Sequence, residues 1–448
     1  MYNELLQFQR NNVWTLVHRP EEDHIIGTKW IFHNKTDEER NVIRNKACLV
    51  AQGYSQVEGV NFDETFASIA CMESIRVLLA LACHLKFKLY QMDVKIAFLN
   101  GFLKEDVYVA QLIGFIDPHF PYHMLYFKKA LYGLKQAPRA WYDRLTQYLV
   151  SCRFTRGQAN QTLFIKKENG ELIVAQVFVD DIIFGSTKDE LAHEFSKLMQ
   201  AEFKISMIGK LSHFLGLQIH QQESGLFISQ SKYAKNLVKK FGLESASPVR
   251  TPMSLNVKLI VDLLGKSVDS SLYKSMIGSL LYFTASRPNI SYSVRVCARY
   301  QANPKESLMI ALKRIIKYVK TTADFRVWYS KDTNDVLAGY SDVDWVGNAD
   351  DRKSILGVVF MWVIILSPGR VRSRIPSHYP LLRLNTSLSV AIALNFYGCK
   401  KSFLIMVFVK NILQFIMTIP VPLASVKILC NILEKTYIDS TSLHSRAC

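Results

Sequence analysis

Two adjacent aspartates, Asp180 and Asp181, interrupt an apolar run from 177 to 184. Another apolar run, 172–175, precedes it, and a Gly-Ser pair follows. Short apolar runs bounded by Gly and Ser indicate β-strands, so the sequence predicts a hairpin with two carboxylates at its tip. An unpaired, partly buried carboxylate is costly, and the hard oxygen ligands at such a tip suit Mg²⁺. For this stretch alone, a solvated Asp-Asp turn is the alternative interpretation.

A third carboxylate strengthens the first interpretation. Asp93 ends a strand-like run that begins at Tyr90, and an apolar piece and an Asn-Gly turn follow. A lone Asp at a strand end is usually a cap. One Asp on a strand, together with two on a distant hairpin, is the ligand set of a two-metal phosphoryl-transfer site.

Together these segments resemble the reverse transcriptases of copia-type retrotransposons. The resemblance runs from about Trp14 to Met361, and beside the two acidic segments it rests on TKWIF at 28–32, LVAQGY at 49–54, FDETFA at 62–67, ALYGLKQAPRAW at 130–141 and YSDVDW at 340–345. It implies an α+β fold, a right hand of fingers, palm and thumb, followed by a helical connection and an incomplete ribonuclease H-like region.

The resemblance also assigns roles to individual residues. It implies that catalysis and metal binding rest on Asp93, Asp180 and Asp181, with Mg²⁺, or alternatively Mn²⁺, as the cofactor. It implies that the nucleotide and the template are contacted by Lys46, Phe98, Gln136 and Val179. Its expected partners are an RNA template, a DNA primer, the RNA–DNA hybrid and deoxynucleoside triphosphates.

Several of these positions have a simpler interpretation. In the family an aromatic at the place of Phe98 abuts the sugar and excludes ribonucleotides, and the rest of the motif favours this role for Phe98 over the alternative of a core aromatic. The family usually has Arg where Cys48 and Cys71 stand, and the loss of two cations beside a phosphate site would weaken nucleotide binding. Alternatively, both are buried cysteines that act as small hydrophobic residues. Without the resemblance, Gln136 is an ordinary loop residue.

Periodicity and turn signals give the expected elements and boundaries. We expect a lead-in at 1–27, a reverse transcriptase domain at 28–243, a linker and helical connection at 244–330, the start of a ribonuclease H-like domain at 331–362 and an aberrant tail at 363–448. The expected helices are 2–9, 72–84, one that begins at Pro138, 229–241, 271–285, 290–301 and 305–320. The expected strands include 28–33, 47–52 and 336–345. The helix 72–84 should pack behind the strand that bears Asp93, and 187–190 has the form of a capping box.

Composition limits the function classes without deciding between them. The 448 residues carry 55 Lys and Arg against 38 Asp and Glu, a formal charge of +17, which suits a polyanionic partner. Eight Cys without a Cys-x-x-Cys pair are most simply free thiols. The N-terminus lacks an apolar signal core, and the sequence has no run of 18 apolar residues, so we expect no membrane span. The expected location is intracellular: cytoplasmic, in virus-like particles, with access to the nucleus.

The last part of the chain departs from the family pattern. Asp342 resembles the first carboxylate of a ribonuclease H domain, but the only acids after residue 362 are Glu434 and Asp439. We back-translated residues 375–387 and read the codons again with the frame shifted by one base. With plausible third bases, the shifted frame encodes the family's SVALSTAEAEYI. A one-base frame disruption near Trp362 is therefore predicted. The residues after Met361 should then fail to complete the sheet that 336–345 begins.

Two functions remain in competition at this point. One is an RNA- and DNA-templated DNA polymerase without ribonuclease H activity. The other is an inactive retroelement remnant that at most binds nucleic acid.

Overall fold

The computed structural model describes residues 1–331 except 21–23, 37–40, 71, 159, 254–258, 260–261 and 263. It also describes strands at 337–344, 355–362 and 389–397. These residues fall into two compact units: residues 1–70 with 90–209, and residues 71–89 with the chain from 210 onward. Among the described residues, no helix is both long enough and apolar enough to cross a membrane.

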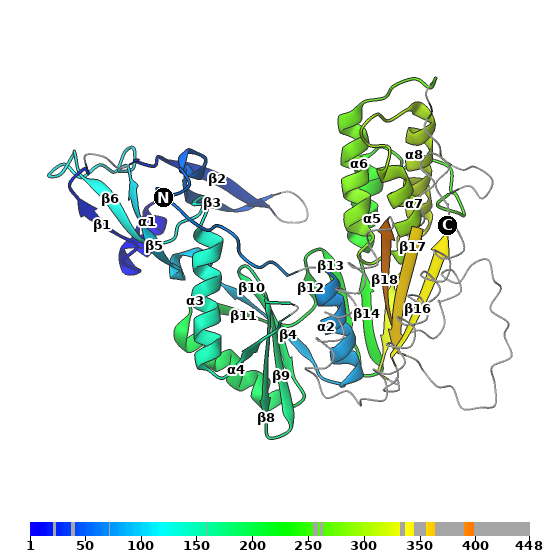
Figure 1. The fold of residues 1–448 in the computed structure, drawn as a ribbon, viewed down its shortest axis with the longest axis horizontal. Helices are drawn as coiled ribbons and strands as arrows, with labels where there is room; N and C mark the ends of the chain where they lie inside the picture. Colours follow the sequence, from blue (N-terminus) through cyan, green and yellow to red (C-terminus); the bar gives the residue numbers. More distant parts are fainter. Residues whose placement is uncertain are drawn as a thin grey trace, which may run out of the picture. The chain divides into compact units, whose positions relative to one another are not determined.

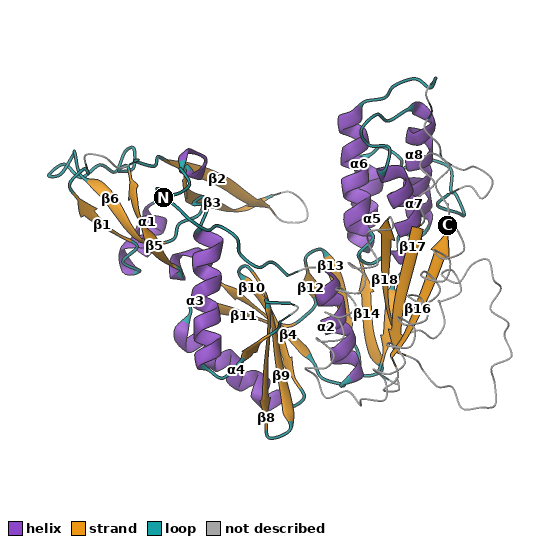
Figure 2. Cartoon of the chain, in the orientation of Figure 1, coloured by secondary structure: helices purple, strands orange, loops and turns teal. Residues whose placement is uncertain are grey.

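The centre of the first unit is a six-stranded sheet with the order β11-β4-β10-β9-β8-β7 (Figure 1). Its strands are β4 (Leu89–Val94), β7 (Thr155–Arg156), β8 (Leu163–Glu168), β9 (Glu171–Phe178), β10 (Asp181–Ser186) and β11 (Ile205–Lys210). Helices α3 (Ala137–Ser151) and α4 (Asp189–Glu202) pack on one face of this sheet (Figure 2). The expected hairpin is confirmed, because Asp181 pairs with Phe178 and leaves Val179 and Asp180 as the turn.

The apolar stripe of α3 explains this packing. Trp141, Leu145 and Leu149 recur at helical spacing and are all buried against the sheet. Alternate residues of β9 and β10 face the same core, as the period of two in a strand requires. Pro138 lies in the first turn of α3, where its missing N–H has no cost.

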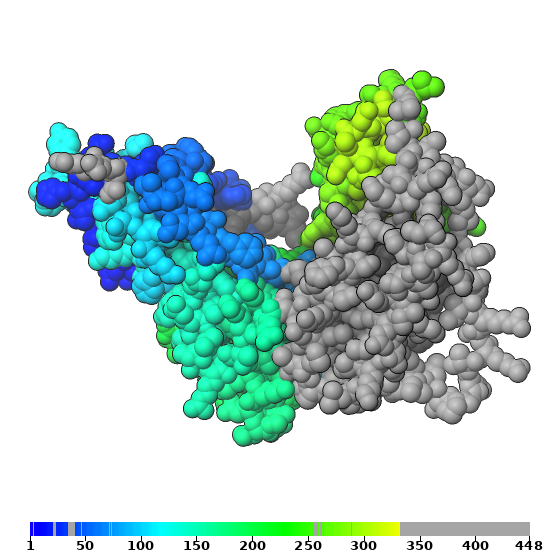
Figure 3. Space-filling model, in the orientation of Figure 1, coloured from blue at the N-terminus to red at the C-terminus, as the bar shows by residue number. Residues whose placement is uncertain are grey.

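Two smaller sheets complete the first unit. One has the order β1-β6-β5 and contains β1 (Trp14–Val17), β5 (Phe102–Val109) and β6 (Met124–Lys129). The other is the hairpin of β2 (Thr28–Thr36) and β3 (Val42–Ala51), which confirms two predicted strands and lengthens both. The first helix is α1 (Tyr2–Arg10), and two 3₁₀ turns are η1 (Gly53–Ser55) and η2 (Ala97–Asn100). Strands β1 and β6 pair across more than 100 residues of chain, and the blue and cyan segments accordingly form one surface in Figure 3.

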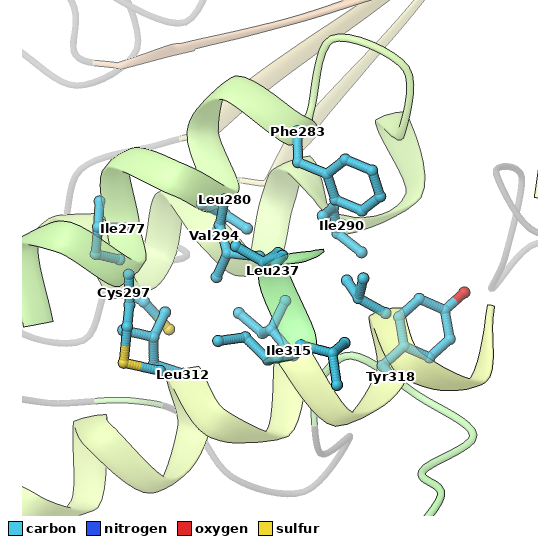
Figure 4. Packing of buried hydrophobic residues seen from close by; sticks show 14 of the residues in the cluster. Leu237, Ile277, Leu280, Phe283, Ile290, Val294, Cys297, Leu312, Ile315 and Tyr318 are labelled. Atoms are coloured by element: carbon cyan, nitrogen blue, oxygen red, sulfur yellow. The ribbon is translucent and has the colours of Figure 1, made fainter. Parts of the chain in front are cut away.

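The second unit contains an antiparallel sheet and a helical bundle. The sheet has the order β12-β13-β14-β15 and contains β12 (His213–Phe214), β13 (Leu217–Gln221), β14 (Gly225–Ser229) and β15 (Val327–Ser330). The bundle contains α5 (Ser231–Lys240), α6 (Ser270–Phe283), α7 (Pro288–Ala298) and α8 (Glu306–Thr321). Figure 4 shows the core of the bundle, in which Leu237, Leu280 and Leu312 are buried together. The expected boundary between 243 and 244 therefore lies between helices that share one core.

Helix α2 (Met72–His84) has the predicted bounds, while its expected packing behind the strand of Asp93 stays a prediction. Within the second unit α2 packs against β14, β15 and the later strand at 389–397, and the Cys83 Sγ donates to the Tyr329 carbonyl at 3.1 Å. Part of its apolar face, which includes the buried Leu78 and Leu79, is thus covered by strands that come more than 100 residues later in the chain. Periodicity predicts an apolar face but does not identify its partner.

The capping box expected at 187–190 is also wrong. Helix α4 begins after Lys188, and no side chain caps it. The Thr187 hydroxyl accepts from the Leu172 N–H at 3.0 Å and donates to the Glu171 carboxylate, so it serves strand β9 instead. Thr and Ser hydroxyls bond equally well to whichever main chain lies nearest.

The chain after Met361 contradicts another expectation. Strand β18 (Ser389–Tyr397) pairs antiparallel with β17 (Ile355–Trp362), which in turn pairs with β16 (Leu337–Asp344). The free edge of β17 offers main-chain donors and acceptors to any extended segment. A run such as SVAIALNFY, with β-branched, apolar and aromatic residues, has high strand propensity whatever its origin. The remainder of the predicted tail lies outside the described residues.

Candidate active site

The three predicted catalytic carboxylates come from neighbouring strands of the first unit. Asp93 lies in β4, Asp181 begins β10, and β4 and β10 are adjacent in the sheet. The Val94 N–H donates to the Asp180 carbonyl at 2.8 Å, which aligns the end of β4 with the Asp-Asp turn. All three side chains are half-buried. The structure therefore places Asp93 on the strand beside the turn that carries Asp180 and Asp181, and the catalytic role of the three residues stays a prediction.

The backbone on both sides of this cluster is strained. Val179 has φ of 54°, and Ile96, just after Asp93, has φ of 54° and ψ of 45°. A β-branched residue rarely adopts the left-handed region, and such a conformation costs on the order of 1–3 kcal/mol. The Trp141 indole Nε1–H donates to the Val179 carbonyl at 2.7 Å and so holds the turn from helix α3.

Asp181 is the carboxylate with the most perturbed environment. Burial raises the pKa of its carboxyl group, and the negative charges of Asp180 and Asp93 raise it further. The buried Gln91 opposes this shift, because its Nε2 donates to the Asp181 Oδ1 at 2.9 Å. Three carboxylates that repel one another are the electrostatic precondition for binding a cation.

The raised pKa gives the first prediction. At neutral pH the charged Asp181 destabilises the folded state, because the folded chain holds this proton more tightly than the unfolded chain. Asp181→Asn should therefore stabilise the metal-free chain at pH 7, and the gain should fade as the pH falls through the folded-state pKa of Asp181 towards its unfolded value. Urea unfolding in EDTA at pH 4 and pH 7 measures this difference.

The control for that experiment is Asp106→Asn, an exposed carboxylate of β5 that accepts one hydrogen bond from Tyr126. It should show no pH-dependent gain. An equal effect of Asp181→Asn at both pH values would contradict the prediction.

The donor set fits a hard divalent cation, but it is not assembled into a coordination shell. Three carboxylates supply the oxygen ligands that Mg²⁺ prefers. Among the ion pairs of the described residues, none involves Asp93 or Asp181, so neither charge is neutralised in that way. Within the described part of the chain, no group of three or more His, Cys, Asp or Glu side chains is close enough to hold a metal. Binding would therefore require the three side chains to turn towards one another.

Phe98 lies beside the carboxylates and contacts a residue that the sequence does not single out. The Phe98 and Tyr132 rings are 4.7 Å apart at 59°. Burial raises the pKa of Tyr132 to about 12, and the charges of Asp180 and Asp93 contribute to the shift. Tyr132 therefore stays protonated at neutral pH. Phe98 itself is half-buried and packs partly against two hydrophobic cores.

Comparison with known protein families places this cluster in context. The model of the family described as reverse transcriptase (RNA-dependent DNA polymerase) matches residues 11–255, more than half of the chain. The chain belongs to the reverse transcriptase family. The match includes Asp93, Asp180, Asp181 and every residue described so far in this site.

Three curated relatives of this reverse transcriptase chain are transposon proteins. It is 35% identical over 378 residues to the retrovirus-related Pol polyprotein from transposon RE1 of Arabidopsis thaliana, which covers 82% of this chain and 26% of that protein. It is 32% identical over 371 residues to the Pol polyprotein from transposon TNT 1-94 of Nicotiana tabacum, with coverage of 80% and 28%. It is 27% identical over 253 residues to a putative transposon Ty5-1 protein of Saccharomyces cerevisiae, with coverage of 56% and 82%. The chain thus spans about a quarter of the length of these two plant Pol polyproteins, and the copia-type resemblance is confirmed.

Gln136 is buried among other amides, and its expected contact with the nucleotide or the template stays a prediction. Its side chain is 2% exposed and lies just before α3. Its Oε1 accepts from the Gln56 Nε2 at 2.9 Å, and its Nε2 donates to the Asn61 carbonyl at 2.8 Å. Both ends of the amide are therefore engaged within the protein.

The remaining predicted residues are placed only in part. Lys46 lies in β3 opposite His33, but its side chain is not among those described. Cys48 is a half-buried free thiol of the same strand, and Cys71 lies outside the described residues. Asp342 lies in β16 opposite Gly357, in the other unit from the three carboxylates.

Three functional candidates could not be found from the sequence. Gln91 and Trp141 have the spacing of ordinary strand and helix residues, and nothing indicates that they bond to Asp181 and Val179. Tyr132 belongs to the family motif at 130–141, but no periodicity marks it. Its signal is the following Gly133, whose φ of 95° turns the chain beside the cluster.

Proposed function

We propose that this chain is an RNA- and DNA-templated DNA polymerase of a copia-type retrotransposon. The observation that carries the proposal is the convergence of Asp93, Asp180 and Asp181 from adjacent strands in a chain of the reverse transcriptase family. Three close carboxylates are the ligands of a two-metal phosphoryl-transfer site. The substrates are deoxynucleoside triphosphates and a primer paired with an RNA or DNA template.

The carboxylates would hold two Mg²⁺ ions. The chemistry supplied by bound Mg²⁺ is activation of the primer 3′ hydroxyl and neutralisation of the leaving pyrophosphate. Gln91 orients Asp181 through its hydrogen bond, and Trp141 fixes the turn that presents Asp180. Tyr132 keeps its proton, because burial and the charges of Asp180 and Asp93 disfavour its ionisation. In this proposal, β2–β3 belongs to the fingers, the six-stranded sheet to the palm and α5 to the thumb.

The proposal is tested by Mg²⁺-dependent primer extension on RNA and DNA templates. Templated extension that is lost in Asp180→Asn supports the polymerase. A folded wild-type chain that extends neither template supports the second candidate, a remnant that at most binds nucleic acid. The observation that favours the remnant is Cys48, a thiol in the strand where the family usually has a cation.

Phe98 gives a prediction about sugar selection. Its half-buried ring lies against Tyr132 at the edge of the carboxylate cluster, where a bulky side chain can oppose a 2′ hydroxyl. Phe98→Ala should raise ribonucleotide incorporation relative to deoxyribonucleotide incorporation by roughly tenfold or more. The measurement is the ratio of kcat/KM for matched ribo- and deoxyribonucleotides. Unchanged discrimination in an active Phe98→Ala variant would leave Phe98 as a core aromatic.

Ribonuclease H activity should be absent. One carboxylate, Asp342, cannot hold two divalent cations against their hydration. Strand β18 completes a three-stranded sheet but contributes no acidic residue. We therefore expect no cleavage of RNA in an RNA–DNA hybrid, even where polymerase activity is present. Comparable cleavage by this chain and by one with the reading frame restored near Trp362, abolished in both by Asp342→Asn, would refute this expectation.

The frame disruption itself is tested on the coding DNA. A single-base insertion or deletion near Trp362 should restore the family pattern over residues 375–387. If no such change restores it, the tail has another origin.

A further inference from the structure

A buried amide network joins two loops of the first unit. Gln56, Asn61 and Gln136 are 5%, 3% and 2% exposed. Besides its bond to Gln136, the Gln56 side chain accepts from the Lys135 N–H at 2.8 Å, and the Asn61 Oδ1 accepts from the Val57 N–H at 3.1 Å. A buried polar group that loses its partner costs about 1–3 kcal/mol, so these bonds strongly favour one arrangement of the two loops.

The main chains of the two loops also lie unusually close together. A Cβ added to Gly53 would lie 1.9 Å from the Gly133 carbonyl oxygen, and one added to Gly133 would lie 2.1 Å from the Ala51 carbonyl oxygen. No larger residue fits at either position without displacing main chain. The Ala51 N–H donates to the Tyr132 carbonyl at 2.8 Å, which fixes the same contact.

A second attachment lies one turn further along α3. The Arg139 Nη1 donates to the Glu64 carboxylate and to the Phe66 carbonyl, both at 2.9 Å. Segment 53–66 is therefore attached to the first turn of α3 twice, by the buried amide of Gln136 and by the more exposed guanidinium of Arg139. Helix α3 then continues to Trp141, which holds the Val179 carbonyl beside Asp180.

We propose that Gln136 is a positioning residue, whose amide clasps segment 53–66 to the start of α3 instead of contacting the nucleotide or the template. Gln56 is its partner, and the clasp fixes α3, Trp141 and, through them, the turn that carries Asp180. This inference rests on the proposed polymerase function. It follows from the burial of the Gln136 side chain and from the use of both its Oε1 and its Nε2 in hydrogen bonds inside the protein.

The test is a double-mutant cycle on the full chain with Gln56→Met, Gln136→Met and both changes together. Methionine keeps the length of the side chain and removes its hydrogen bonds. Each single change should lower kcat for primer extension by about tenfold to a hundredfold, because a small misplacement of the turn is enough. The KM for the deoxynucleotide should change less than about twofold. The double variant should be no slower than the slower single variant, since both changes break the same clasp.

The same cycle on urea unfolding provides a readout that does not depend on activity. Gln56→Met and Gln136→Met should couple by roughly tenfold in the unfolding equilibrium constant. The matched control is Gln176→Met in β9, a fully buried Gln bonded to Asn160 and Thr162, which should be additive with Gln56→Met.

The inference would be overturned if Gln136→Met raised the KM for the deoxynucleotide while Gln56→Met left kcat and KM unchanged. It would also be overturned if the losses of unfolding free energy in Gln56→Met and Gln136→Met were additive. If Gln136→Met does not fold, Arg139→Met tests the other attachment of segment 53–66. The expected result is a lower kcat at constant KM for the deoxynucleotide. A raised KM for the deoxynucleotide would count against the clasp. A folded wild-type chain without polymerase activity would overturn the proposed function, while the unfolding cycle would still decide the clasp.

Discussion

Asp180→Asn is expected to lower Mg²⁺-dependent primer extension by roughly three orders of magnitude, since the carboxylates supply several kcal/mol of transition-state stabilisation through the bound cations. Asparagine keeps the size of the side chain but removes the charge that holds a divalent cation. The Trp141 bond to the Val179 carbonyl should survive, because it uses main chain at the turn. The measurement is single-turnover extension of a primed RNA template, and of a primed DNA template, by wild type and variant.

The matched control for Asp180→Asn is Asp106→Asn, which removes one exposed carboxylate from β5. It should extend both templates at close to the wild-type rate. If Asp180→Asn keeps more than about a tenth of the wild-type rate, Asp180 is not a metal ligand in this chain.

Arg287→Met should produce the largest loss of stability in the second unit. Arg287 is 3% exposed, and its guanidinium donates to the carbonyl and hydroxyl of Thr322 at 2.7 and 2.5 Å. It lies 5.3 Å from the centres of both the Phe283 and Phe325 rings. Burial lowers the pKa of this guanidinium, but an arginine remains charged at neutral pH. It therefore caps the C-terminal end of α8 with a cation where the helix dipole favours one.

Removing that cation leaves the Thr322 carbonyl at the end of α8 without its buried donor. The expected cost is about 3 kcal/mol of unfolding free energy. Arg287→Lys should recover little, because an ammonium cannot reproduce the planar fork. Urea unfolding followed by the helical circular dichroism signal measures the loss, and Arg295→Met, an exposed position of α7, is the control. Equal losses at the two positions would contradict the capping role.

The sequence predicted those features that repeat locally. The apolar spacing in 72–84 gave the bounds of α2, and the runs around Asp180 and Asp181 gave the β9–β10 hairpin. The positions of Asp93 and Asp181 on strands were predictable from the apolar runs around them, while their role as metal ligands stays a prediction. Such patterns predict a single helix or strand, because they arise from the periodicity of side chains within that helix or strand.

Long-range pairing was not predictable, for physical reasons that individual residues illustrate. Gln56 and Gln136 are 80 residues apart, and an amide in a loop looks the same whether it meets water or another amide. Thr187 was interpreted as a helix cap, but its hydroxyl accepts a hydrogen bond from the Leu172 N–H of strand β9 instead. The packing of α2 against β14 and β15 was not predicted, because an apolar face fits any complementary apolar surface. The strand at 389–397 pairs through main chain, which carries no sequence signal of its own.

The distance along the chain between α2 and β15 has a consequence for synthesis on the ribosome. Helix α2 ends at His84, and β15, which packs against it, begins only at Val327. At about 5–20 residues per second, the apolar face of the helix waits roughly 10–50 seconds for that strand. During this interval the nascent chain should attract chaperones that bind exposed apolar helices. Strand β18, which also packs against α2, begins only at Ser389, so part of the cover of this helix comes from beyond the predicted frame disruption near Trp362.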